Sequence, residues 1–223
     1  MPIHPIGEKG KKGSLGCPYA NRDYRTVNPE YGTMEDFKKL VGEIHARGMK
    51  CMIDVVYNHT SPDSVLYSEH PEYFYHDADG KPGNKIGDWS DVIDLDYNNR
   101  GLWDYQIESL CMWAEIVDGF RCDVASFVPL EFWLKARAAV EKVNPDCIWL
   151  CGVIDKRAFI AHEGAYARLV VVFQEAELIV VRRIDCLLEV QHVQIATQGD
   201  LALQIFVERL AHIVFIFQIE RGE

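Results

Sequence analysis

The sequence lacks the features that would place the protein in a membrane or on a nucleic acid. No apolar run is long enough to cross a bilayer, and no signal peptide opens the chain. Basic residues are too few for a nucleic-acid surface, since 23 Lys and Arg stand against 34 Asp and Glu, a formal net charge of -11. We therefore expect a soluble protein with no membrane and no nucleic acid among its partners; the sequence leaves its oligomeric state open.

The cysteines show no pattern typical of a disulfide framework or a metal site. There are seven of them, an odd number, and no metal-ligand spacing occurs. Cys51, Cys122, Cys147 and Cys151 fall inside expected strands, where a thiol usually behaves as a small buried hydrophobe. A reduced, cytoplasmic setting fits this usage best. Internal repeats and low-complexity segments are absent as well.

What the sequence does contain is an alternation of helical and strand patterns. At 223 residues and 48% hydrophobic composition, the chain can bury a core. A helix is predicted from Thr33, with Asp36 completing a capping box, to Gly48. Its expected apolar stripe is Phe37, Leu40, Val41 and Ile44. The apolar run 51–56 follows, as expected of a buried parallel strand.

The alternation continues to about residue 154. A helix after residue 98, a strand over 119–124 and a strand over 147–154 are predicted. Between the two strands a helix is expected to begin at Pro129, with the apolar stripe Leu130, Trp133, Leu134 and Ala138. Such an order fits either a β/α barrel or a doubly wound sheet, and both place sites at the carboxyl ends of strands. After Asp155 helix caps and turn residues become scarce.

Two charged side chains stand in the strand that reads GFRCDVASFV. Burying a charge in a strand is costly unless the charge is paired or used in chemistry. Arg121 and Asp123 are two residues apart, so they share one strand face. A structural ion pair and a functional site are equally compatible with this pair taken alone. Asp54, Asn58 and His59 at the end of the strand 51–56 favour a site, because they add polar groups at a second strand end.

These two stretches resemble signature regions of the α-amylase family of glycoside hydrolases and transglycosidases. The resemblance is dense from about residue 1 to residue 150. Further motifs that carry it are Ile3-His4-Pro5-Ile6-Gly7, Tyr19 with Asp23-Tyr24, Asn28-Pro29-Glu30-Tyr31-Gly32-Thr33, Trp89-Ser90-Asp91 and Asp94-Leu95-Asp96.

The resemblance implies an α/β fold, a partial (β/α)8 TIM barrel with a small domain inserted after the third barrel strand. Partial barrel is expected over 1–57, the inserted domain over 58–97, barrel helix 3 to strand 5 over 98–154, and a divergent tail over 155–223. The first barrel strand and most of the second are expected to be missing before Met1, which would leave exposed sheet edges. The aromatic residues of the insertion suit either sugar stacking or a small core of their own.

The resemblance also implies roles for individual residues. Asp123 matches the catalytic nucleophile of a retaining mechanism, and Arg121 would keep it ionised and oriented. Asp54 and His59 match positions that bind the sugar beside the scissile bond, and Tyr19 matches an aromatic that stacks on it. The implied substrate is an α-glucan or maltooligosaccharide.

The resemblance implies no required cofactor. It does suggest a structural calcium ion in many members, for which Asn58 and Asp94 match oxygen ligands.

The sequence departs from the family where the general acid is expected. The family pattern there is Ala-Glu-Ser, but this chain reads Cys151-Gly152-Val153, and a glycine cannot protonate a leaving group. The family's third carboxylate, in an Asn-His-Asp motif, has no counterpart in the tail. A one-base shift of reading frame would turn codons for Ala-Glu-Ser into codons for Cys-Gly-Val.

Three functional interpretations therefore stay open. The first is an α-glucan hydrolase or transglycosidase impaired by Gly152. The second is a non-catalytic protein that binds carbohydrate or a partner. The third is a frameshifted, inactive fragment.

Overall fold

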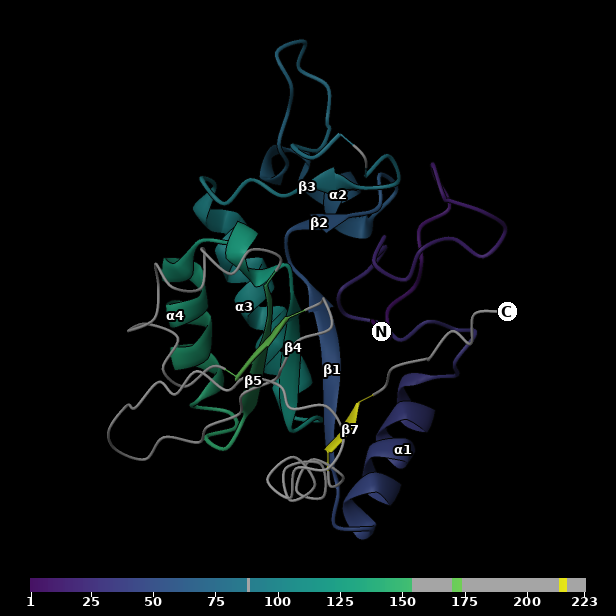
Figure 1. Cartoon of the computed structure of the whole chain (residues 1–223), viewed down its shortest axis with the longest axis vertical. Helices are drawn as coiled ribbons and strands as arrows, with labels where there is room; N and C mark the ends of the chain where they lie inside the picture. The colour runs from purple at the N-terminus through teal and green to yellow at the C-terminus, as the bar shows by residue number, and fades with distance from the viewer. Residues whose placement is uncertain (88, 154–169, 174–212, 216–223) are drawn as a thin grey trace, which may run out of the picture.

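A five-stranded parallel sheet forms the centre of the chain in the computed structural model, which describes residues 1–87, 89–153, 170–173 and 213–215 (Figure 1). Its strands lie side by side in the order β6-β5-β4-β1-β7. Their bounds are Lys50–Val56 for β1, Gly119–Asp123 for β4, Ile148–Val153 for β5, Val170–Phe173 for β6 and Ile213–Phe215 for β7.

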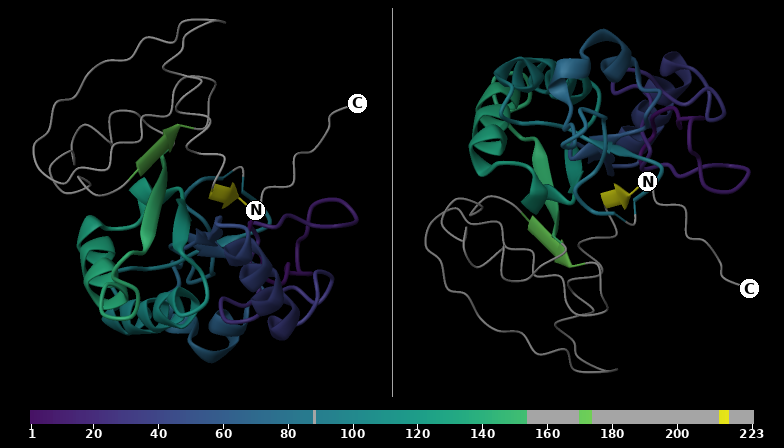
Figure 2. Two further views of the ribbon diagram at one scale, coloured as in Figure 1. Left: turned by 90° about the horizontal axis from the view of Figure 1, so that it is seen from below. Right: turned by 90° about the horizontal axis from the view of Figure 1, so that it is seen from above.

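The helices decide between the two fold classes that the sequence allowed. They are α1 (Met34–Ala46), α3 (Arg100–Ala114) and α4 (Leu130–Val140). Figure 2 shows all three on one face of the sheet. Strands β1, β4, β5 and β6 are neighbours in chain order, and β7 lies on the other edge of β1. A doubly wound sheet carries helices on both faces. The described residues therefore have the architecture of part of a β/α barrel.

Helix α1 confirms the predicted capping box. The Thr33 hydroxyl accepts the Asp36 N–H, and the Asp36 carboxylate accepts the Thr33 N–H. The apolar stripe is narrower than predicted: Phe37, Val41 and Ile44 are buried, but Leu40 is 48% exposed. Leu40 lies at the margin of the stripe, about 60° around the helix from Phe37. Its inclusion in the core was wrong.

Helix α4 begins one residue later than predicted, because Pro129 is its extended N-cap rather than its first helical residue. The predicted stripe was wrong for Leu134 and Ala138, which are exposed, whereas Trp133 is buried and Leu130 packs against the core. The buried residues are Phe132, Trp133, Ala136 and Val140. Apolar residues occur on nearly every side of this helix, so periodicity alone could not select the buried face. Packing against the aromatic core selects it.

The core between sheet and helices is rich in aromatic rings. Trp133 stacks on Tyr57 with ring centroids 6.0 Å apart, and its edge meets Trp149 at 6.4 Å. Cys51, Cys122 and Cys151 are buried in strands as predicted. The prediction was wrong for Cys147, which is half-buried and directly precedes β5.

The segment between β1 and α3 contains a second, two-stranded antiparallel sheet of β2 (His59–Thr60) and β3 (Ile93–Asp94). It also contains α2 (Val65–Glu69) and the short helix η1 (Pro71–Tyr73). Figure 1 shows this segment beyond the carboxyl end of β1. Phe74 is buried there, edge-on to Tyr67 at 5.0 Å. These two aromatics pack together, and the division of the chain into domains stays a prediction.

The outer edge of β1 is paired only in part. Strand β7 pairs with Lys50–Met52, and the described residues supply no strand partner beyond Met52 on that side. The predicted divergent tail, 155–223, lies outside the described residues except for the backbones of β6 and β7. No helix in the described ranges combines the length and the apolar character needed to cross a membrane.

Candidate active site

Four residues that the sequence singled out meet on one face of the sheet near its carboxyl end. Asp54 of β1 pairs in register with Arg121 of β4, and Arg121 pairs with Leu150 of β5. Side chains alternate along a strand, so Asp123 shares the face of Arg121. Gly152 of β5 lies against Arg121 on this face. The position where the family's general acid is expected therefore belongs to this face.

Arg121 joins the two carboxylates. Its Nη1 donates to both oxygens of Asp54 at 3.0 Å and to Oδ1 of Asp123 at 2.6 Å. All three residues are less than 10% exposed. Buried charges persist only when they are paired, and here one cation holds two anions. The arrangement leaves Asp123 oriented and held beside a fixed positive charge.

The protonation of these groups follows from burial and from one another. Burial raises the pKa of Asp123 to about 6; Arg121 opposes this rise and Asp54 adds to it. Burial also raises the pKa of Asp54, against the effect of Arg121. Burial alone would lower the pKa of Arg121, but the two carboxylates raise it above its ordinary value. Asp123 is therefore mostly ionised at pH 7, and Arg121 stays cationic.

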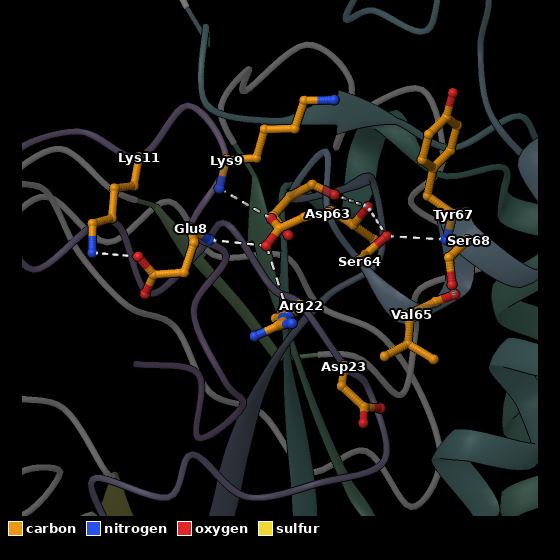
Figure 3. Close-up of polar contacts among 12 residues, drawn as sticks. Glu8, Lys9, Lys11, Arg22, Asp23, Asp63, Ser64, Val65, Tyr67 and Ser68 are labelled. Atoms are coloured by element: carbon orange, nitrogen blue, oxygen red, sulfur yellow. Dashed lines mark hydrogen bonds and ion pairs between the residues drawn. The ribbon is translucent and has the colours of Figure 1, made fainter.

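Tyr19 joins this group from the N-terminal loop. Its hydroxyl donates to Oδ2 of Asp54 at 3.2 Å. The loop is closed on itself, since the Gly7 N–H donates to the Ala20 carbonyl at 2.9 Å. The Asp63 carboxylate anchors this loop, since it accepts hydrogen bonds from the backbone N–H groups of Glu8 and Lys9 (Figure 3). The two distances are 3.1 and 3.3 Å.

Asp63→Ala is expected to loosen the loop that carries Tyr19. Because two charge-assisted hydrogen bonds are lost at a partly exposed site, stability should fall by about 1 kcal/mol. Limited proteolysis should cut residues 8–17 faster than in the unsubstituted chain. Asp79→Ala, in another exposed turn, is the matched control. Equal cleavage of the two variants would contradict the anchoring role.

His59 lies apart from the contacts of Arg121. Its Nδ1 is 3.2 Å from the Asn58 amide nitrogen, and its ring meets Trp89 edge-on at 5.2 Å. Burial lowers the pKa of His59 to about 4, so the ring is neutral at pH 7. A neutral imidazole can still donate a hydrogen bond to a sugar hydroxyl through one ring nitrogen, or accept one through the other. Its sugar-binding role stays a prediction.

The residues predicted to bind calcium lie together. The Asn58 amide nitrogen donates to Oδ1 of Asp94 at 3.4 Å, and Oδ2 of Asp94 accepts the Lys85 N–H at 2.8 Å. Calcium takes six to eight oxygen ligands. Within the described part of the chain, no three His, Cys, Asp or Glu residues form a metal-binding group. The calcium site stays a prediction.

One feature near Asp123 gave no sequence signal. Val124 has φ of 38° and ψ of 42°, the left-handed conformation that a β-branched residue avoids. It lies between β4 and the short helix η2 (Ala125–Phe127), as the N-cap of that helix. Such strain costs on the order of 1–3 kcal/mol and is concentrated at functional sites. The left-handed conformation of Val124 turns the chain out of the strand direction directly after Asp123.

Gly152 lies against the Arg121 guanidinium. A Cβ atom at this position would stand 2.7 Å from Nη2 and 3.2 Å from Nε of Arg121. Any side chain at residue 152, including a glutamate, would therefore require Arg121 to move. Arg121 is held by Asp54 and Asp123, so this movement would disturb the charge cluster.

Gly152→Ala is expected to destabilise the chain by about 1–3 kcal/mol, since the new methyl overlaps a held guanidinium. Gly87→Ala is the control, because a Cβ there meets no atom within 4 Å. Urea unfolding of both variants measures the difference. A Gly152→Ala variant as stable as the Gly87→Ala variant would show that Arg121 adjusts freely.

The parallel sheet with its helices on one face carries a carboxylate, an arginine and a second carboxylate at its strand ends. The sequence profile described as "Alpha amylase, catalytic domain" matches residues 5–90. The chain belongs to the α-amylase family of glycoside hydrolases and transglycosidases.

Named relatives agree with this assignment. An alpha-1,4-glucan:maltose-1-phosphate maltosyltransferase of Rhodospirillum rubrum is 34% identical over 171 residues, covering 67% of this chain and 25% of the relative. A crystal structure of an alpha-amylase from Lactobacillus plantarum is 57% identical, covers 73% of this chain and 38% of that chain, and superposes with a TM-score of 0.69.

A maltogenic alpha-amylase from Thermotoga neapolitana is 44% identical, with coverage of 75% and 41% and a TM-score of 0.66. The chain spans about a quarter of the length of the curated relatives it matches.

Proposed function

We propose that this chain carries the nucleophile of a retaining enzyme that acts on α-glucosidic bonds, and that Gly152 impairs its turnover of ordinary glucans. One observation carries the proposal: Arg121 Nη1 donates to Asp123 Oδ1 at 2.6 Å on a strand face that Asp54 completes. In the proposed reaction Asp123 attacks the anomeric carbon and forms a glycosyl ester. Arg121 keeps the carboxylate ionised and fixes its direction.

The proposed substrate is an α-glucan or maltooligosaccharide. Support comes from the relatives, whose names describe a glucan maltosyltransferase and a cyclomaltodextrin glucanotransferase. Tyr19 and Asp54 would hold the sugar ring beside Asp123, since they are already joined by a hydrogen bond. A cytoplasmic location and the absence of membrane and nucleic-acid partners stay predictions.

A second candidate is a protein that binds carbohydrate without turning it over. Gly152 favours it, because the face that holds Asp54, Arg121 and Asp123 has no side chain where a general acid is expected. General acid–base catalysis contributes roughly 10²-fold to 10⁴-fold in rate. Saturable binding of maltotetraose without any covalent intermediate would support this candidate.

The experiment that tests the first proposal traps the glycosyl ester. A 5-fluoro-α-glucosyl fluoride carries a leaving group that needs no proton, and its ring fluorine slows breakdown of the ester. Peptide mass spectrometry is expected to find the label on Asp123. Labelling should fall as the pH is lowered through about 6, since only the ionised carboxylate attacks. Absence of any label, or a label elsewhere, would overturn the proposal.

A further inference from the structure

Two aromatic side chains lie at the edge of the candidate site and have no part in the reaction proposed above. Phe127 is a large apolar residue in η2, shortly after Asp123, and yet it is 43% exposed. Its ring centroid is 6.2 Å from that of Trp89. The Trp89 ring in turn meets His59 edge-on. The Trp89–Phe127 pair therefore connects the segment that follows β1 with the segment that follows β4.

Both rings are carried by backbone that other side chains hold in place. The Asn84 amide donates to the carbonyl oxygen of Trp89 at 2.7 Å. The indole N–H of Trp133 donates to the carbonyl oxygen of Ala125 at 3.0 Å, which ties η2 and its Phe127 to α4. A surface that is already fixed binds a ligand with little further loss of conformational freedom. An exposed aromatic pair on such a backbone, next to a polar site, favours a ligand-binding use.

The inclination of the two rings indicates which ligand they suit. The planes of Trp89 and Phe127 are inclined at 44°. Sugar rings stack on aromatic faces, because their C–H groups meet the electron-rich face of the ring. An α-1,4-linked glucan bends at each axial linkage, so its successive rings are turned relative to one another, whereas a β-1,4-linked chain is a flat ribbon. Two inclined faces can contact successive rings of a bent chain, but they cannot both lie flat on a ribbon.

Resting on the proposed function, we infer that Trp89 and Phe127 form an aromatic subsite that binds maltooligosaccharide residues beside the glucose ring that Asp123 attacks. The attacked ring itself lies against Tyr19 and Asp54. The aromatic subsite sets specificity and takes no part in making or breaking bonds. It favours several α-1,4-linked glucose residues over a single glucose ring, and over a β-linked chain of the same length.

The test measures the binding of maltotetraose, cellotetraose and methyl α-glucoside to the whole chain by isothermal titration calorimetry. Maltotetraose is expected to bind about tenfold more tightly than either of the others, or better. Phe127→Ala should weaken maltotetraose binding by about tenfold, whereas Phe127→Tyr, which keeps an aromatic face, should stay within about threefold of the unsubstituted chain. Leu134→Ala removes another exposed apolar side chain, on α4, and should leave binding unchanged.

Three results would overturn the inference. They are equal affinity of Phe127→Ala and the unsubstituted chain for maltotetraose, an equal loss in Phe127→Ala and Phe127→Tyr, and binding of cellotetraose as tight as that of maltotetraose. Urea unfolding of Phe127→Ala and Leu134→Ala checks that both variants are folded.

The labelling of Asp123 by 5-fluoro-α-glucosyl fluoride tests the proposed function separately, because this reagent carries a single sugar ring. A label on Asp123 together with maltotetraose binding that does not depend on Phe127 would keep the nucleophile and reject the aromatic subsite. Binding that depends on Phe127 without any label would reject the nucleophile and keep the subsite.

Discussion

Replacing Arg121 with methionine is expected to destabilise the chain by about 3–5 kcal/mol at pH 7. The substitution leaves Asp54 and Asp123 buried, close together and without their shared cation. A loss of this size is a large part of the total stability of a typical domain. Urea unfolding followed by circular dichroism measures it. Arg47→Met is the control: Arg47 pairs with Glu43 in solvent, so its loss should cost less than about 1 kcal/mol.

The pH dependence of Arg121→Met separates charge from packing. Without Arg121, the pKa values of Asp54 and Asp123 in the folded chain rise further above their unfolded values. The folded state then binds protons more tightly than the unfolded state, so stability increases as the pH falls. The deficit of Arg121→Met should therefore be smaller at pH 5 than at pH 7. An equal deficit at both values would mean that the lost volume of Arg121, and not its charge, is responsible.

Asp123→Asn is expected to lower the rate of covalent labelling by on the order of 10⁴-fold or more, because an amide oxygen is a poor nucleophile. Binding of maltotetraose should change far less, since Tyr19, Asp54 and Arg121 remain in contact. The two effects are measured by mass spectrometry of the labelled peptide and by isothermal titration calorimetry.

Asp104→Asn provides the comparison for this experiment, with the same change of chemistry on an exposed helix position. It should label at the rate of the unsubstituted chain. Labelling of Asp123→Asn at Asp54 would assign the nucleophile to the neighbouring strand. Loss of labelling together with loss of maltotetraose binding would indicate a misfolded sample, which urea unfolding of the same sample would detect.

Much of the site could be predicted because it depends on strand periodicity. Arg121 and Asp123 are two residues apart, so any strand places them on one face. The resemblance of residues 54–59 to a family motif supplied Asp54, and the structure brings it within 3.0 Å of Arg121. Gly152 was singled out by its departure from the family pattern. The structure then placed it against the Arg121 guanidinium.

Other features depend on contacts between distant segments, which periodicity does not report. The exposed positions of Leu40 and Leu134 were missed because each lies on a helix with apolar residues at several angles. The left-handed Val124 has no sequence signal, since valine avoids that conformation. The anchoring of the N-terminal loop by Asp63 joins residues more than fifty positions apart.

The sequence by itself determined the alternation of helices and strands up to residue 153, the resemblance to the α-amylase family, and the replacement of an expected acid by Gly152. These features depend on residue types and local spacing. Only the tertiary structure decided that the helices cover one face of the sheet, as in part of a barrel, because that depends on how distant segments pack. It also decided that Arg121 binds both carboxylates and lies against Gly152, since three separate strands must come into register for one guanidinium to reach all of them.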